Sequence, residues 1–147
     1  MTFATFVVVI SFVQSGASVS AQDIPSDADL AAASSRSVRV GALSSDGRVT
    51  SVPLEVYVAR VLAGEGEPRA ADAAQQALAI AIRTYALANF DRHGREGFDV
   101  CDTTHCQVPR AATAASRRAA LATAGQVLTW RGSIAQAFYS EIGRAHV

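Results

Sequence analysis

The sequence predicts a single α+β domain, and three patterns carry that prediction. Residues 38–52 have the pattern of a β-hairpin, residues 52–86 that of two amphipathic helices, and residues 111–140 that of another helix followed by another hairpin. Because the strand patterns flank the helices instead of alternating with them, we expect β-hairpins packed with about three helices. A chain of 147 residues is long enough to bury a hydrophobic core in one such domain.

The first hairpin is predicted from two short runs of strand-forming residues. Residues 38–43 and 49–52 are rich in valine and other apolar residues. The intervening residues 44–47, SSDG, end in a glycine that can supply the positive φ of a tight turn.

Two helices are predicted from apolar residues that recur at i, i+3, i+4 and i+7. They are Leu54, Tyr57, Val58, Val61 and Leu62 in the first helix, and Ala74, Ala77, Leu78, Ala81, Ile82 and Tyr85 in the second. Residues 64–68, GEGEP, break the helix between them with two glycines and a proline. Glu65 and Glu67 are therefore expected on a sharp turn between two buried helices, either as a functional pair or as a solvated acidic loop. If Pro68 began the second helix, the helix dipole would favour the charged form of both carboxylates.

The rest of the chain is predicted as a polar loop, an aperiodic segment, a helix and a hairpin. Residues 91–97 are the loop, and residues 101–107 show neither helical nor strand periodicity. A helix over residues 111–124 would end at Gly125, a suitable residue for a helix C-terminus. Strands at 126–130 and 134–140 would then form the second hairpin.

The N-terminal residues and the charge balance bear on compartment and partners. Residues 1–21 combine a short apolar run with a small-residue cleavage site, which predicts a signal peptide and export; a buried strand or a misplaced start is the alternative. Residues 22–37 are predicted to be a flexible linker. Thirteen basic and thirteen acidic residues cancel, so no electrostatic case exists for nucleic acid.

Four blocks of the sequence together resemble one family. VPLEVYVARVLAGEGEP followed by QALAIAIRTYAL is similar to the core of the SpoIID/LytB domain, the family of stage II sporulation protein D and of amidase enhancers. FDVCDTTHCQV and ATAGQVLTWRGSIAQAFYS resemble its later blocks. The resemblance covers residues 38–140, and residues 141–147, EIGRAHV, depart from it. We therefore expect a domain that is incomplete at its C-terminus and a tail that is not native.

The resemblance implies a lytic transglycosylase that cleaves the glycan strands of peptidoglycan. Counting back from Arg83 without a gap places the family's catalytic glutamate on Glu65, whereas the departure at GEGEP leaves Glu67 as the alternative. The alternative function is a non-catalytic amidase enhancer, a wall-binding module that activates a partner hydrolase. A third interpretation is an exported structural domain.

Four further residues are candidates for substrate binding. Arg83 is expected as a substrate clamp or as the partner of a carboxylate, and Gln107 as a hydrogen-bonding partner of a sugar amide. Tyr139 and Ser140 match a family block beside the active cleft, although their pattern alone indicates the end of a strand.

Cys101, His105 and Cys106 allow three interpretations. Two cysteines in an exported chain favour a disulfide between Cys101 and Cys106. The same two thiolates with His105, and with His93 as the nearest fourth ligand, are a candidate structural zinc site. Free thiols are the third interpretation. Some family members carry a metal at the matching block, and no cofactor is expected to be needed for catalysis.

Overall fold

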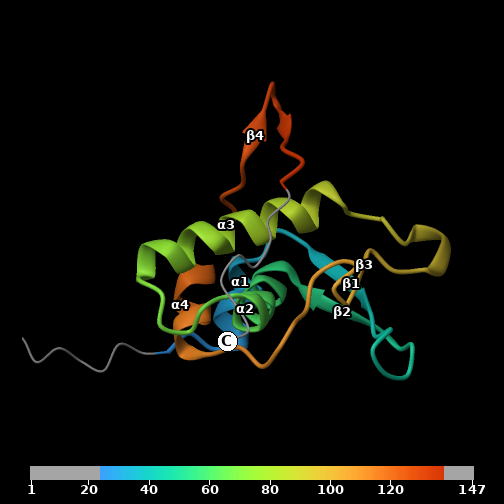
Figure 1. Ribbon diagram of the computed structural model, residues 1–147, viewed down its shortest axis with the longest axis horizontal. Coiled ribbons are helices and arrows are strands. Elements are labelled where there is room, and N and C mark those ends of the chain that lie inside the picture. The colour runs from blue at the N-terminus through green and yellow to red at the C-terminus, as the bar shows by residue number, and fades with distance from the viewer. Residues whose placement is uncertain (1–23, 138–147) are drawn as a thin grey trace, which may run out of the picture.

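The computed structural model describes residues 24–137 and shows an α+β fold (Figure 1), which confirms the predicted fold class. In chain order the elements are α1 (Asp27–Ala33), β1 (Ser37–Gly41), β2 (Val49–Pro53), α2 (Leu54–Glu65), α3 (Asp72–Ala88), the 3-10 helix η1 (Gly94–Glu96), β3 (Val100–Cys101), α4 (Ala114–Ala122), β4 (Thr129–Trp130) and β5 (Ser133–Ile134). Tyr139, Ser140 and the tail 141–147 lie outside the described residues, as does the predicted signal peptide.

The first hairpin forms as predicted and gains a third strand. β1 and β2 pair antiparallel, with Val40 opposite Thr50, and β3 pairs parallel to β1 on its other side, with Val40 opposite Val100. The sequence did not indicate β3, because a strand of two residues is too short to show a period of two. This strand brings the segment that begins at Cys101 onto the core.

α2 lies at the centre of the helical layer. It packs against α1, α3 and α4, and Figure 1 shows α3 running across the molecule beside α4. The buried hydrophobic residues of the three longer helices are Leu54, Val56, Tyr57, Val58, Ala59, Val61 and Leu62 of α2, Ala79, Ile82, Tyr85 and Ala86 of α3, and Ala119 and Ala120 of α4. α2 is thus buried around most of its circumference, whereas its sequence period indicated one apolar face.

The predicted linker contains a helix, so that expectation was wrong for its central part. Ser26 caps α1 with a capping box: its Oγ accepts the backbone N–H of Asp29, and Asp29 Oδ2 accepts the backbone N–H of Ser26 at 2.8 Å. Leu30 is completely buried, and Ser34 Oγ accepts the N–H of Glu55 at 2.9 Å. Leu30 and the hydrogen bond from Glu55 to Ser34 therefore hold α1 against α2, although the composition of the segment is that of a linker.

The C-terminal elements are shorter than expected. α4 begins three residues later than predicted, because Thr113 caps it through a capping box with Ser116. Gly125 follows with φ 74°, as expected for a residue after a helix end. β4 and β5 form a hairpin that projects from the body (Figure 1, red), and Trp130 on it is 69% exposed.

Candidate active site and metal centre

Glu65 is the last residue of α2, and its position corrects one expectation. Gly66 ends the helix with its N–H on the carbonyl of Leu62 at 2.9 Å, and the next helix begins only at Asp72. Pro68 therefore does not start α3. Glu65 lies at the negative end of the α2 dipole, which disfavours the charged carboxylate, instead of at a helix N-terminus that would favour it.

The Glu65 carboxylate is held by a backbone donor from a distant segment. The N–H of Val108 donates to Glu65 Oε1 at 2.7 Å, and the side chain is partly buried. The same segment also contacts the middle of α2, because the N–H of Arg110 donates to the carbonyl of Arg60 at 2.9 Å. A Cβ on Gly64 would lie 1.9 Å from the carbonyl oxygen of Val108, so only glycine allows this approach.

Glu67 lies two residues away in a different environment. It is exposed, and its Oε1 accepts the N–H of Arg69 at 3.3 Å within the turn. Of the two carboxylates, Glu65 is the one with a partner from a distant part of the chain.

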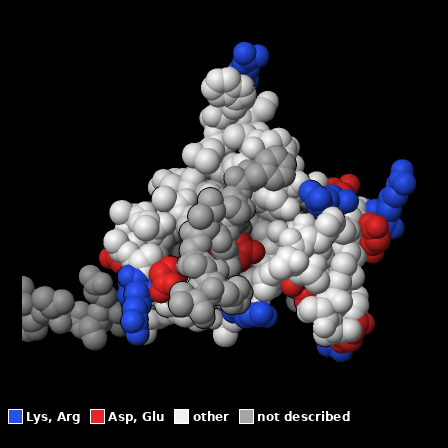
Figure 2. All heavy atoms as spheres, in the orientation of Figure 1, with Lys and Arg blue, Asp and Glu red and all other residues white. Residues whose placement is uncertain are grey.

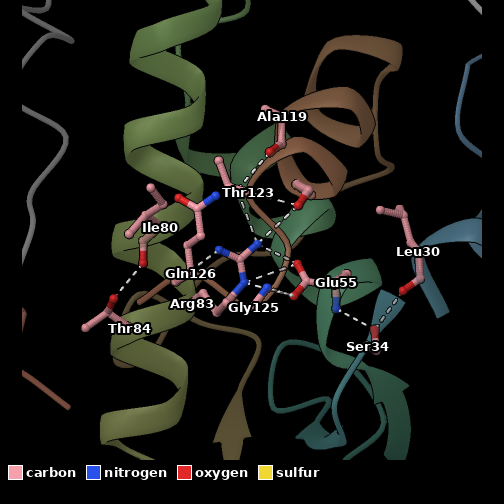
Figure 3. A network of polar contacts seen from close by, with 11 residues as sticks. Leu30, Ser34, Glu55, Ile80, Arg83, Thr84, Ala119, Thr123, Gly125 and Gln126 are labelled. Atoms are coloured by element: carbon pink, nitrogen blue, oxygen red, sulfur yellow. Dashed lines mark hydrogen bonds and ion pairs between the residues drawn. The ribbon is translucent and has the colours of Figure 1, made fainter. Parts of the chain in front are cut away.

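Arg83 is buried in the core, with no exposed side-chain surface. The expectation that it is a substrate clamp was therefore wrong. It is the partner of a carboxylate, which was the other expectation. Figure 3 shows its guanidinium facing Glu55, with Nε 2.9 Å from Glu55 Oε1. Its other nitrogens donate to the carbonyls of Gln126 at 3.0 Å and Ala120 at 3.2 Å. Gly125 donates its N–H to Glu55 Oε1 at 3.2 Å. The arginine joins α2, α3 and the end of α4.

Gln107 is also buried, with 1% exposure, and this corrects its expected contact with a sugar. The hydroxyl of Tyr57 donates to Gln107 Oε1 at 2.9 Å, and Gln107 Nε2 donates to the carbonyl of Ile82 at 3.3 Å. Burial raises the pKa of Tyr57 well above its ordinary value, and the nearby Cys106 and Glu65 add to the rise. The phenol therefore stays neutral and acts as a donor.

Four side chains form a thiol–imidazole cluster, which we define as His93, Cys101, His105 and Cys106. Their potential ligand atoms all lie within 4.8 Å of one another. The sulfur of Cys106 is 3.4 Å from His93 Nε2 and 3.7 Å from His105 Nδ1, and the sulfur of Cys101 is also 3.7 Å from His105 Nδ1. No disulfide joins the two cysteines in the described part of the chain, and their sulfurs are 2.7 Å apart.

The cluster fits the donor set of a structural zinc site. Zn–S and Zn–N bonds of about 2.3 and 2.0 Å in a tetrahedron place sulfur about 3.5 Å from nitrogen, close to the three sulfur–nitrogen distances. The two sulfurs would have to separate by about 1 Å to occupy adjacent corners of such a tetrahedron. Around the ligands, His93 Nδ1 lies 3.7 Å from the Glu96 carboxylate, and the ring stacks on Phe98 at 4.7 Å. An acidic partner of this kind orients a ligating imidazole.

In the absence of a metal, the surroundings of Cys106 favour the protonated thiol. Burial and the hydrogen bond with Cys101 raise the pKa of Cys106 to about 12. A bound cation reverses this preference, because coordination stabilises the thiolate.

The family is decided by comparison with known proteins. The model of the family described as SpoIID, stage II sporulation protein, matches residues 44–130, more than half of the chain. The chain belongs to the SpoIID family. No curated protein matches it. Membership of this family supports a cell-wall function that is related to sporulation.

The match contains Glu55 and Glu65, the two carboxylates of α2 in the SpoIID domain, and the whole thiol–imidazole cluster. Within residues 24–137, none of the helices has the length and hydropathy needed to cross a membrane.

Sequence reasoning missed Glu55 and Tyr57 of the SpoIID domain. A signal for Glu55 was present, since a carboxylate lies between Leu54 and Val56 in a strongly apolar stretch. A charge in such a place requires a buried partner, and Arg83 is the corresponding charge in the second helix. No comparable signal exists for Tyr57, whose periodic position indicates only the core.

Proposed function

We propose that this SpoIID domain is a peptidoglycan lytic transglycosylase in which Glu65 is the single acid and base. The observation that supports it most is the position of Glu65: a partly buried carboxylate at the end of a buried helix, held by the N–H of Val108. Partial burial and the negative end of the α2 dipole favour the protonated form that a general acid needs, whereas the N–H of Val108 favours the carboxylate that a general base needs. The solvated Glu67 lacks both features.

The reaction needs one carboxyl group in two protonation states. Protonated Glu65 gives its proton to the bridging oxygen of the glycosidic bond while an oxocarbenium-like state develops at the anomeric carbon. The carboxylate then accepts the proton of the C6 hydroxyl of the same sugar. The hydroxyl oxygen attacks the anomeric carbon and leaves a 1,6-anhydro end, so no water is consumed and Glu65 is protonated again.

The charge distribution is compatible with a sugar polymer as the partner. On the face drawn in Figure 2, basic and acidic side chains are scattered in small groups of mixed sign. Such a surface suits the neutral sugar rings of a glycan strand better than a polyanion. Because the substrate is a wall polymer, the proposal includes export to the cell envelope.

The second candidate is the amidase enhancer, favoured by the projecting hairpin. Leu128, Trp130 and Ile134 are 49%, 69% and 39% exposed. Exposed apolar side chains on a projecting element are typical of a surface that binds another protein. In this case the partner would be a cell-wall amidase.

Product analysis distinguishes the two candidates. Full-length protein is incubated with purified glycan strands, and mass spectrometry detects the ends of the fragments. The transglycosylase yields 1,6-anhydro ends; an enhancer yields none but raises the rate of a separately purified amidase. Ends that carry a free reducing sugar would contradict the proposed chemistry, because they show attack by water.

We further propose that the thiol–imidazole cluster holds one structural zinc ion. The four side chains supply two sulfurs and two nitrogens, and zinc would crosslink β3 and η1 at the edge of the three-stranded sheet. The ion takes no part in the steps above.

A further inference from the structure

Three consecutive residues connect the thiol–imidazole cluster to the proposed acid. Cys106 belongs to the cluster, Gln107 lies in the core, and Val108 donates its N–H to Glu65. We call residues 106–108 the connecting run. Two residue steps of extended chain span at most about 7 Å, so a displacement of Cys106 is transmitted over a short distance.

The connecting run is held between α2 and α3. Gln107 accepts the hydroxyl of Tyr57 from α2 and donates to the carbonyl of Ile82 in α3. On the side of Val108, the absent side chain of Gly64 lets the carbonyl approach α2. Buried hydrogen bonds and close packing leave the run few alternative positions, which is the property that a rigid mechanical link requires.

We propose that the connecting run couples the metal state of the cluster to the position of the Glu65 carboxylate. Zinc separates the two cysteine sulfurs, Cys106 moves with its sulfur, and the run carries the movement to the N–H of Val108. Tyr57 and Gln107 are positioning residues that keep the link rigid. The catalytic consequence rests on the proposed function, whereas the structural coupling does not.

The structural coupling is tested by NMR on the full-length protein, reduced and freed of metal by a chelator. Zinc ions are added while the amide resonance of Val108 and the side-chain carboxyl resonance of Glu65 are followed. Both resonances should shift in proportion to the amount of zinc bound. They should reach saturation at the same zinc concentration as the ring resonances of His93 and His105. Unmoved Val108 and Glu65 resonances at full zinc saturation would overturn the proposal, and so would a failure of zinc to bind.

Variants locate the link. Tyr57→Phe removes only the hydroxyl that holds Gln107, and Gly64→Ala forces Val108 away from α2. In either variant zinc should still bind, while its effect on the Glu65 resonance should fall by at least half. Thr84→Val is the matched control, because it removes a buried hydroxyl that donates to the carbonyl of Ile80, accepts the N–H of Leu128 and lies outside the link. An equal loss of coupling in the control would overturn the role of Tyr57.

Kinetics separate this inference from the proposed function. If Glu65 is the acid, Tyr57→Phe should lower kcat about tenfold with little change in KM, because the acid is misplaced while the glycan still binds. A coupled NMR response without any 1,6-anhydro product would remove the proposed function and keep the link. Cleavage that proceeds without coupling would remove the link alone.

Discussion

The two ends of α2 each carry a glutamate, and the two carboxylates have opposite environments. Glu55, in the first turn, is 1% exposed and bound by Arg83 and by the N–H of Gly125. Glu65, the last residue, is partly buried and receives the N–H of Val108. The helix dipole favours a charge at the first position and disfavours it at the second.

This difference separates a structural carboxylate from a candidate catalytic one. The Glu55–Arg83 pair lies at the junction of three helices, where both charges are desolvated and neutralise each other. A buried charge of this kind must keep its partner, because an unpaired charge in the core is very costly. Glu65 instead receives the N–H of Val108 at the C-terminal end of α2, where the helix dipole favours uptake of a proton.

The largest effect is expected from breaking the buried pair. Glu55→Gln leaves the charge of Arg83 in the core without its counter-charge, which should lower the free energy of unfolding by about 3–5 kcal/mol. Urea titration followed by circular dichroism measures the change. Any glycan cleavage that remains should fall only with the folded fraction. A variant of unchanged stability would contradict the structural role of Glu55.

Glu65→Gln should affect chemistry and leave the fold intact. Losing the acid should lower the cleavage rate at least about a hundredfold, which corresponds to about 2.7 kcal/mol of activation free energy. The side-chain amide still accepts the N–H of Val108, so the melting temperature should change little. Glu67→Gln is the matched control, and its rate should stay within about twofold. If the control loses activity and Glu65→Gln keeps it, the acid is Glu67.

The sequence predicted the helices and the turn because these depend on local pattern. The i, i+3, i+4 recurrence located α2 and α3, and GEGEP located the break that follows Glu65. The ends were less predictable. Pro68 was considered as a possible first residue of α3, but the chain stays non-helical until Asp72, three residues beyond the exposed Arg69.

The burial of Arg83 and Gln107 was not predictable from local pattern. Both are polar residues in segments that could equally face a cleft, and their partners lie 28 and 50 residues away in Glu55 and Tyr57. Such pairings depend on how helices pack, which a helical period does not report. His93 was predicted to join Cys101, His105 and Cys106 because cysteine and histidine are rare in this chain, and the structure places the four side chains together.

Metal removal should distinguish the two ends of α2. At ten times its dissociation constant, a zinc ion bound only to the folded state adds about 1.4 kcal/mol of stability. Chelation should therefore lower the melting temperature by several degrees. Hydrogen exchange should show faster exchange at the amides of Val108 and Arg110 and little change at Gly125. Metal analysis should find near one zinc per chain.

Mass spectrometry of the protein before reduction tests the alternative for the cysteines. A mass lower by two hydrogens, with no metal bound, would show that Cys101 and Cys106 form a disulfide and would remove the zinc proposal. Cys101→Ser is the informative variant, since it abolishes the disulfide and leaves three of the four ligands.

The smallest effect is expected midway along α2, where Asp27 of α1 contacts Arg60 of α2 and Arg117 of α4. Burial works to raise the pKa of Asp27, but the hydrogen bond from Arg117 and the charges of both arginines lower it below its ordinary value of 3.8. A lowered folded-state pKa contributes stability above the unfolded value, and that contribution is lost as the pH falls through the folded value.

Asp27→Asn should therefore destabilise the protein at neutral pH and have a smaller effect in acid. Because the Asp27 side chain is 46% exposed, solvent screens the pair and the loss at pH 7 should be only about 0.5 kcal/mol. Urea titrations of both proteins at neutral pH and near pH 3 measure the difference, which should shrink at the lower pH. A double-mutant cycle with Arg117→Gln should show that the two losses are not additive, because each substitution removes the same pair. A loss that stays constant with pH would mean that Asp27 acts through the N-terminal turn of α1 and not through its charge.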